Sequence, residues 1–351
     1  MKARAETVPD TTNARKDEAI DAILGDPRTD RRRHAFDAFR LRHRALPELN
    51  LEDVDPATRF LDRPLAFPLL ISSMTGGDHD RLRTVNRNLA LAAERTGVAM
   101  GVGSQRVLFT DPPSRDSFAL RPLAPSIPLL ANLGAVQLNY GFGLDECREA
   151  VRVLEADGLC LHLNPLQEAV QPEGNTRFGG LADRIGAVAS ALEVPVVVKE
   201  VGAGLSLADA RLLVARGIRH LDVAGSGGTS WSRIEHHRQP ARGGHELGLT
   251  FQDWGTPTPE ALRELAALGP DVTRIASGGI RSGVDMAKAL ALGASLCGVA
   301  RPFLEPALES AEAVEAVIKR FRREFVTALF LLGIPRTADL VGRTDLLAEA
   351  H

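Results

Sequence analysis

The sequence is poor in cysteine. Only Cys147, Cys160 and Cys297 occur in 351 residues, and no C-x-x-C pair is present. An odd count without that spacing predicts no disulfide framework and is typical of a reducing compartment. The N-terminus lacks the apolar run of a signal peptide, and no apolar run approaches the roughly 20 residues of a membrane span. We therefore expect a cytoplasmic protein that does not enter a membrane.

The sequence also lacks a strong excess of charge. Its formal net charge is -3, and 25% of its residues are charged. The one basic cluster, Arg31-Arg32-Arg33, is typical of a solvated helix face or turn. This balance argues against nucleic acid as a partner.

What the sequence does contain is a repeated alternation of short apolar runs with helical patterns. Eight such units predict a closed (β/α)₈ TIM barrel rather than an open sheet, because parallel strands joined by helices bury both faces. The predicted strands lie at residues 69–74, 100–104, 129–133, 159–163, 195–201, 220–224, 273–276 and 296–302.

The remaining segments are predicted to surround this barrel. Residues 1–14 are polar and typical of a disordered tail. Residues 15–351 form one domain with an N-terminal extension, 15–66. This extension begins with a short helix from Arg15 through Leu24, and its residues 25–66 wrap the outside of the barrel. Residues 225–257, after the sixth strand, form an insertion long enough to be functional, often as a lid. A closing helix is expected at 311–332.

A glycine turn follows the seventh predicted strand. Gly278 and Gly279 allow a sharp turn into a helix, and Arg281 adds a cation at its entrance. The loops after strands 7 and 8 of such barrels commonly hold a phosphate, and a helix N-terminus suits that anion. We therefore predict that these loops bind a phosphorylated cofactor or substrate.

Polar residues follow six strands at their carboxyl ends, where the active sites of this fold lie. Lys199 is either a cation facing a flavin or phosphate, or the partner of Glu200. Glu168 is either a Mg²⁺ ligand or a helix-start carboxylate. His162 is either a metal ligand or a satisfied barrel residue. Arg15-Lys16 is either a diphosphate clamp or part of a solvated tail.

Several motifs together resemble the type 2 isopentenyl diphosphate isomerase family. The stretch from His162 to Gln171 and the stretch from Gly227 to Trp231 are specific to it, whereas Ser277 to Arg281 is shared with other FMN barrels. The other matching motifs are Arg15-Lys16, Met74-Thr75-Gly76-Gly77 and Gly103-Ser104-Gln105-Arg106.

The resemblance implies an FMN-dependent barrel that interconverts isopentenyl and dimethylallyl diphosphate in isoprenoid biosynthesis. It implies Mg²⁺, reduced FMN supplied through NADPH, and a homo-oligomer, a tetramer or octamer. Shifting a double bond requires adding one proton and removing another, and reduced flavin supplies a donor that side chains lack.

The resemblance also assigns residues. FMN contacts are Ser73, Met74, Thr75, Ser104, Asn132, Lys199, Ala224, Thr229, Gly279, Ile280, Arg281, Ala300 and Arg301. Contacts to the prenyl diphosphate substrate are Arg15, Lys16, Ser104, Gln105, Arg106, His162, Asn164 and Gln167. Gln167, Trp231 and Glu235 are the catalytic candidates, and Glu168 is the metal ligand. Two positions depart from the family pattern: Ala19 replaces a usual His, and Ala224 a frequent Ser.

Three alternatives compete with this interpretation. An FMN-dependent 2-hydroxy-acid oxidase or dehydrogenase needs a His base after a late strand, but His236, His237 and His245 lack that context. An enzyme like inosine-monophosphate dehydrogenase needs a cysteine in a flexible loop. A flavin-binding regulatory barrel without catalysis is disfavoured because unused buried polar groups are costly.

Overall fold

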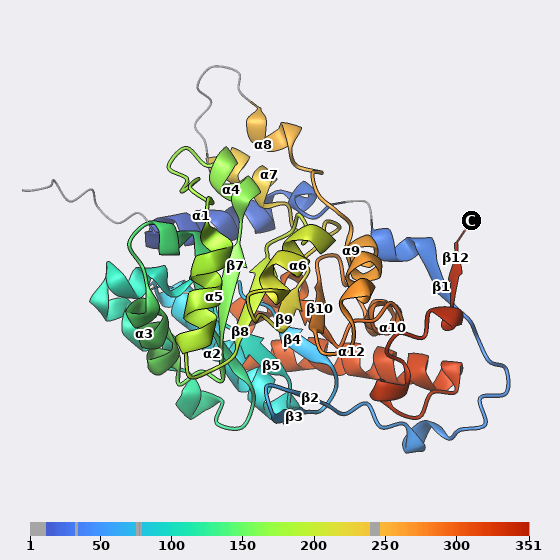
Figure 1. The fold of residues 1–351 in the computed structure, drawn as a ribbon. Coiled ribbons are helices and arrows are strands. Elements are labelled where there is room, and N and C mark those ends of the chain that lie inside the picture. Colours follow the sequence, from blue (N-terminus) through green and yellow to red (C-terminus); the bar gives the residue numbers. More distant parts are fainter. Residues whose placement is uncertain (1–11, 32–33, 75–76, 78, 239–245, 351) are drawn as a thin grey trace, which may run out of the picture.

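The eight predicted strands form a closed parallel barrel surrounded by helices (Figure 1). The computed structural model describes residues 12–31, 34–74, 77, 79–238 and 246–350, without the side chains of residues 12–15 and 112. The barrel strands, each hydrogen-bonded to the next with β11 closing onto β4, are β4 (Leu69–Ile71), β5 (Ala99–Gly101), β6 (Leu129–Gly134), β7 (Gly158–Leu163), β8 (Val196–Glu200), β9 (His220–Asp222), β10 (Thr273–Ser277) and β11 (Leu296–Val299).

The helices lie outside this barrel. A large apolar cluster between strands and helices includes Phe303, Phe321 and Phe325, all fully buried. The closing helix matches its prediction and begins at Ser310, whose hydroxyl accepts from the N–H of Ala313. The outer helices are α2 (Asp80–Thr96), α3 (Leu144–Leu154), α4 (Pro165–Val170), α5 (Leu181–Ala191), α6 (Leu207–Val214), α9 (Thr258–Leu265), α10 (Gly283–Ala291), α11 (Arg301–Glu309) and α12 (Ala311–Leu332).

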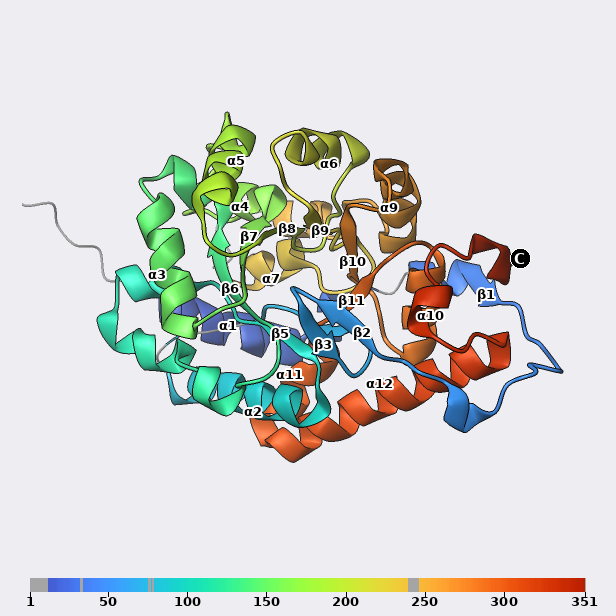
Figure 2. The same ribbon diagram turned by 60° about the horizontal axis from the view of Figure 1, so that its bottom comes forward.

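A two-stranded hairpin closes the N-terminal end of the barrel. It consists of β2 (Thr58–Phe60) and β3 (Arg63–Leu65), which lie in front of the barrel strands in Figure 2. Phe60 and Leu65 join a buried cluster made from six of the barrel strands. The prediction that residues 25–66 wrap the outside of the barrel is therefore wrong for this hairpin, because its apolar side chains complete the barrel core.

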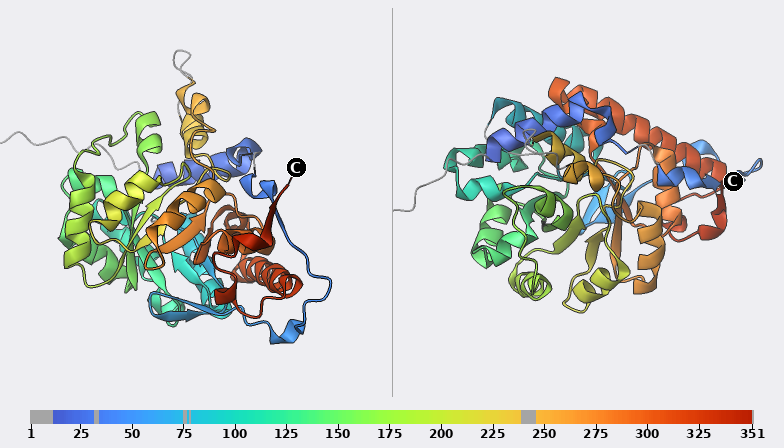
Figure 3. Two further views of the ribbon diagram at one scale, coloured as in Figure 1. Left: turned by 45° about the vertical axis from the view of Figure 1, so that its right-hand side comes forward. Right: turned by 90° about the horizontal axis from the view of Figure 1, so that it is seen from above.

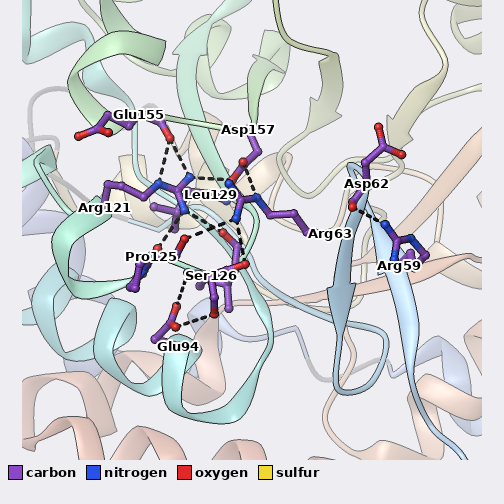
Figure 4. Close-up of polar contacts among 12 residues, drawn as sticks. Arg59, Asp62, Arg63, Glu94, Arg121, Pro125, Ser126, Leu129, Glu155 and Asp157 are labelled. Atoms are coloured by element: carbon purple, nitrogen blue, oxygen red, sulfur yellow. Dashed lines mark hydrogen bonds and ion pairs between the residues drawn. The ribbon is translucent and has the colours of Figure 1, made fainter.

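Ionic contacts fasten this hairpin to the barrel (Figure 4). Arg63 Nε donates to Asp157 Oδ1 at 2.6 Å, and Arg121 Nη2 donates to Asp157 Oδ2 at 2.7 Å. The same Oδ2 accepts from the N–H of Leu129 at 2.9 Å. The Arg121 side chain is 13% exposed and that of Asp157 is 14% exposed. Because this face of the fold supports stability rather than catalysis, we assign the cluster a structural role.

The rest of the N-terminal extension reaches the opposite face. Helix α1 (Thr12–Gly25) contacts α7 (Trp231–Arg238) over the strand ends (Figure 3). It begins three residues inside the tail predicted for 1–14, and residues 1–11 lie outside the described part of the chain. Strand β1 (Phe39–Leu41) then pairs antiparallel with β12 (Leu347–Glu349), so part of the N-terminal extension meets the C-terminal strand at the side of the barrel.

The long insertion after β9 contains two helices that the sequence pattern did not predict. These are α7 and α8 (Leu247–Thr250), which project beyond the barrel at the top of Figure 1. They pack against each other, and α7 also packs against α4. The insertion therefore builds a wall beside the carboxyl ends of the strands.

Candidate active site

A cavity of about 680 Å³ opens at the carboxyl ends of the strands, and each barrel strand or the loop after it contributes to its lining. Helix α1 covers one side with four residues at helical spacing: Lys16, Ala19, Ile20 and Ile23. The predicted site residues that line this cavity are Lys16, Ser73, Met74, Ser104, Arg106, Asn132, His162, Asn164, Gln167, Glu168, Lys199, Ala224, Thr229, Trp231, Glu235, Gly279, Ile280, Arg281, Ala300 and Arg301.

Three predicted residues are not among these lining groups. Thr75 and the side chain of Arg15 lie outside the described residues. Gln105 is fully buried, and its side chain is held at both ends: Nε2 donates to the carbonyl of Ala150 at 3.0 Å, and Oε1 accepts from the N–H of Asn132 at 2.9 Å. A direct contact between Gln105 and substrate does not fit this geometry, and we assign the residue to support of Asn132 instead.

Backbone-to-backbone packing of two glycine loops forms one end of the cavity. Gly278 and Gly279 have φ angles of +92° and +79°. A Cβ on Gly228 would lie 2.8 Å from the backbone N of Gly279. The loops after β9 and β10 can therefore touch only because neither carries a side chain there. Such exposed backbone suits a phosphate group.

Two N–H groups at the start of α10, where the sequence predicts that a phosphate binds, already have acceptors. Gly283 donates to Glu324 Oε2 at 2.8 Å, and Asp285 donates to Ser282 Oγ at 3.2 Å. By contrast, Ala300 and Arg301 at the start of α11 line the cavity directly. The start of α11 therefore borders the cavity, although Pro302 has no N–H and the Phe303 N–H donates to the carbonyl of Ala300 at 2.9 Å.

Carboxylates compensate the predicted cation Arg281. Its Nη2 donates to Asp37 Oδ1 at 2.6 Å and its Nε to Asp285 Oδ2 at 3.1 Å, and these contacts raise the pKa of Arg281 above its usual value. Arg301 donates to the Thr29 hydroxyl at 2.8 Å and to the carbonyl of Ile23 at 3.1 Å, and its Nε lies 3.8 Å from Asp30 Oδ2. Arg301 is therefore less closely paired with a carboxylate than Arg281 is.

His162 is oriented by a chain of buried amides. Asn132 Nδ2 donates to the carbonyl of Val102 at 2.9 Å, so its Oδ1 accepts from His162 Nδ1 at 2.8 Å. Burial, reinforced by Lys199 and Lys16, lowers the pKa of His162 to about 4. The imidazole is thus neutral at pH 7 in the free protein. Nδ1 carries its proton, and Nε2 carries the lone pair.

The carboxylate that pairs with Lys199 is Asp222. Lys199 Nζ lies 3.2 Å from Asp222 Oδ2 and donates to Ser277 Oγ at 3.3 Å. The predicted alternative, a pair with Glu200, is wrong for its side chain, because Nζ contacts only the Glu200 carbonyl, at 2.9 Å. The sequence offered one signal for Asp222: a lone acid inside an apolar strand.

Glu200 has a different role. Its Oε2 accepts from the backbone N–H groups of residues 201–204, which shapes the loop after β8. Burial raises the pKa of the Glu200 carboxyl against the lowering effect of these donors. Nearby, the Arg31 side chain fixes this loop to the insertion. The prediction of a solvated Arg31 is wrong, since it is 6% exposed and donates to the carbonyls of Gly202 and Gln252 at 2.8 and 2.7 Å.

A hydrogen-bonded network lines the side of the cavity next to α7. Asn164 Nδ2 donates to Gln167 Oε1 at 3.2 Å and to Glu168 Oε1 at 2.9 Å. Gln167 Nε2 donates to Glu235 Oε1 at 2.8 Å, and Glu235 Oε2 accepts from Arg238. The network joins four predicted residues: Asn164, Gln167, Glu168 and Glu235. It adds Arg238, which sequence reasoning missed because its partners lie far apart in the chain.

Two buried polar atoms in the lining make no hydrogen bond with any residue that the structure describes: Ser72 Oγ, near the glycine loops, and Asn164 Oδ1, in the network. Such atoms are costly unless a ligand or water completes them. The donor set therefore fits a polar cofactor beside Ser72 and a polar ligand beside Asn164. The described residues contain no group of three His, Cys, Asp or Glu side chains suited to a metal ion.

The alternatives find little support in this geometry. All three cysteines are buried, and burial raises the pKa of Cys147 and Cys160 to about 12, so neither is a ready nucleophile. His237 pairs with Asp26 at 2.7 Å, away from the cavity, and His245 lies outside the described residues.

Comparison with known proteins decides the family. The chain is 56% identical over 339 residues to isopentenyl-diphosphate delta-isomerase of Paracoccus zeaxanthinifaciens, covering 95% of this chain and 97% of that protein. It is 52% identical over 333 residues to the same enzyme of Hydrogenovibrio crunogenus, with 95% and 97% covered. This chain belongs to the isopentenyl-diphosphate delta-isomerase family. The model of the FMN-dependent dehydrogenase family matches residues 169–347, which identifies the FMN-dependent type 2 isomerases.

Solved structures support the fold. A flavocytochrome b2 variant with sulfite bound has a TM-score of 0.68 at 18% identity, covering 95% of this chain and 82% of that one. A mandelate oxidase variant has a TM-score of 0.63 at 21% identity, with 95% and 98% covered. At these identities the hydroxy-acid oxidase alternative is a distant relationship of fold. Among the described residues, no helix combines the length and apolarity needed to cross a bilayer.

Proposed function

We propose that this isomerase interconverts isopentenyl and dimethylallyl diphosphate through reduced FMN and Mg²⁺, with NADPH as the reductant. The observation that carries the proposal is a single cavity with two chemically different ends. One end offers glycine backbone and the start of α11. The other offers Lys16, Arg106, His162 and the Asn164 network. Two phosphorylated molecules, cofactor and substrate, fit these two ends.

The first end suits FMN. We propose that Ser72, Gly279 and Arg301 bind its phosphate and polar edges, and Lys199 contributes an ammonium group, paired with Asp222, at the cavity floor. When bound and reduced, FMN supplies a proton donor and acceptor that no side chain provides for an alkene. The protein contributes position and a fixed electrostatic environment.

The second end suits the diphosphate. Lys16 Nζ already donates to the carbonyl of Ser104 at 3.0 Å, which brings α1 onto the β5 loop. Arg106 lies beside it in the lining. Remote binding energy from these contacts fixes the short prenyl tail, which has few groups to hold. A bound diphosphate would also raise the pKa of His162, since a nearby anion favours the imidazolium form.

Gln167 and Glu235 are the groups proposed to face the prenyl tail. Their 2.8 Å hydrogen bond orients the Gln167 amide, and Trp231 on the same helix as Glu235 supplies an aromatic wall. Glu235 is 2% exposed and contacts Arg238. The carboxylate is thus held in place, ready to accept or return a proton at one of its oxygens.

Glu168 is the proposed Mg²⁺ ligand. It lies in the lining, 8% exposed, where its oxygens accept from Asn164 and the backbone of Asn175. A single protein carboxylate is enough because Mg²⁺ keeps waters and takes substrate phosphate oxygens. This accords with the absence of a three-residue metal cluster among the described residues.

Two departures from the family pattern lie in the lining. Ala19 leaves one donor fewer on α1, so we expect a higher KM with the chemistry intact. Ala224 removes a hydroxyl beside the FMN end. The tetrameric or octameric assembly and the cytoplasmic location stay predictions from the family resemblance.

An anaerobic product assay tests this proposal. The protein is mixed with isopentenyl diphosphate, with oxidised or dithionite-reduced FMN, and with Mg²⁺ or EDTA. We expect dimethylallyl diphosphate only where reduced FMN and Mg²⁺ are both present. A matched reaction with a 2-hydroxy acid should leave the oxidised flavin spectrum unchanged. Product formation with oxidised flavin or with EDTA would contradict the proposed requirements, and flavin bleaching by a hydroxy acid would favour the oxidase.

A further inference from the structure

The floor of the FMN end holds a buried ion pair. Lys199 and Ser277 line the cavity, whereas Asp222 lies beneath them and does not. The side chain of Asp222 is 1% exposed and that of Lys199 is 12% exposed. Removing a carboxylate so fully from water is unfavourable unless charged or hydrogen-bonding partners offset the lost hydration.

Asp222 fixes three groups that come from different strands. Its Oδ2 lies 3.2 Å from Lys199 Nζ at the end of β8. Its Oδ1 accepts from the hydroxyl of Ser277 on β10 and from the N–H of Ala224 at 3.1 Å. Ala224 has a φ of +37°, a conformation that is strained for a residue with a Cβ. One carboxylate thus holds a cation, a hydroxyl and a strained turn together.

The charge of Asp222 has a consequence for anything bound above it. Within the described part of the chain, Oδ2 makes no hydrogen bond, and its ion-pair partner is the Lys199 ammonium. The neighbouring His162 is neutral. With Asp222 present, the pair contributes almost no net charge. Without it, an uncompensated ammonium would act on the flavin through a medium of low dielectric.

We propose that Asp222 is a positioning residue that holds the Lys199 ammonium, compensates its charge and so keeps the reduction potential of bound FMN low. This inference rests on the proposed FMN site. FMN that has taken up two electrons but only one proton is an anion. An uncompensated cation beside it would stabilise this anion and so favour reduction. Asp222 prevents this shift and keeps the reduced flavin electron-rich.

The test is the midpoint potential of FMN in the holoprotein, measured by anaerobic titration against a reference dye. D222N keeps the shape of the side chain and removes its charge. We expect its equilibrium constant for flavin reduction to rise at least tenfold, about 30 mV for a two-electron couple. K199M leaves a buried carboxylate and should shift the potential the opposite way. S277A, which changes no charge, is the matched control and should shift it less than threefold.

The double variant K199M/D222N completes the cycle. It removes both charges, so its reduction equilibrium should return to within threefold of the wild type. An unchanged potential in D222N, or shifts of the same sign in D222N and K199M, would overturn the inference. If D222N does not fold, K199M and the double variant still decide it, because the double variant buries no unpaired charge. Wild-type protein that binds no FMN would instead refute the proposed function.

Discussion

Replacing Arg31 by Ala should release the insertion that carries Trp231 and Glu235. The guanidinium comes from the N-terminal extension yet donates to the Gly202 carbonyl at 2.8 Å and the Gln252 carbonyl at 2.7 Å. Longer contacts of 3.4 Å reach the carbonyls of Thr229 and Trp254. Three segments of backbone, at Gly202, at Thr229 and at residues 252–254, are thus tied to one buried side chain.

The size of the effect follows from these contacts. A hydrogen bond to a charged group contributes about 1.5–3 kcal/mol, so the two short bonds give about 3–6 kcal/mol. Burial works against this gain, because it disfavours the charge and lowers the pKa of Arg31. We therefore take the lower end, about 3 kcal/mol, which is roughly a hundredfold in the equilibrium for local opening. R31K keeps the charge but loses the planar fork, and should recover only part of this.

Hydrogen exchange of residues 246–257 is the direct assay, paired with isomerase kinetics. R31A should speed exchange there by roughly a hundredfold and lower kcat, because Trp231 and Glu235 lose their fixed position. Arg28 is the matched control, since it lies in the same segment with a 66% exposed side chain. R28A should change neither quantity. An exchange rate in R31A within threefold of the wild-type rate would refute the proposed role of Arg31 in holding this insertion.

Three further predictions concern the cavity. E168Q should raise the Mg²⁺ concentration for half-maximal activity at least tenfold in a metal titration, and an unchanged titration would remove Glu168 as the ligand. The pKa of His162 is about 4 in the folded protein, against an ordinary value of 6.5. As pH falls, the unfolded chain therefore takes up this proton before the folded protein does. The contribution of His162 to the free energy of unfolding is therefore complete above about pH 6.5 and falls by up to roughly 3 kcal/mol as pH falls towards 4. In denaturant titrations at different pH values, H162Q should lack this dependence of stability on pH. A224G should raise the free energy of unfolding by up to about 1 kcal/mol, since Ala224 has a positive φ; a decrease of that size would show that the strain is absent.

The barrel was predictable because its strands are local patterns. Runs such as 129–133 and 195–201 are apolar on both faces, and the structure has strands within one residue of each of these bounds. The hairpin 58–65 was not recognised, because only its contact with the barrel interior makes its short strands stable. Helix α7 was missed since its sequence, WSRIEHHR, has no clear apolar stripe, and partners such as Asp26 and Glu18 hold it.

Site residues that belong to a short sequence motif were predictable. Site residues whose charged partners lie on distant parts of the chain were not. Gln167 and Glu168 came from one short stretch with a specific pattern. Asp222 and Arg31 act through partners more than twenty residues away, as in the 3.2 Å pair of Asp222 with Lys199. Arg238 joins the nearby Glu235 to the distant Glu18 and Glu173. Nothing in local sequence tells which carboxylate a buried lysine will meet, since register and barrel closure decide it.

The central claim is that this isomerase uses reduced FMN without consuming it. The decisive measurement follows flavin absorbance and product together, anaerobically, with enzyme carrying pre-reduced FMN, Mg²⁺ and excess isopentenyl diphosphate. We predict many molecules of dimethylallyl diphosphate per flavin while the spectrum stays that of reduced FMN. Reoxidation of one flavin for each molecule converted, or no product while FMN remains bound and reduced, would contradict the account.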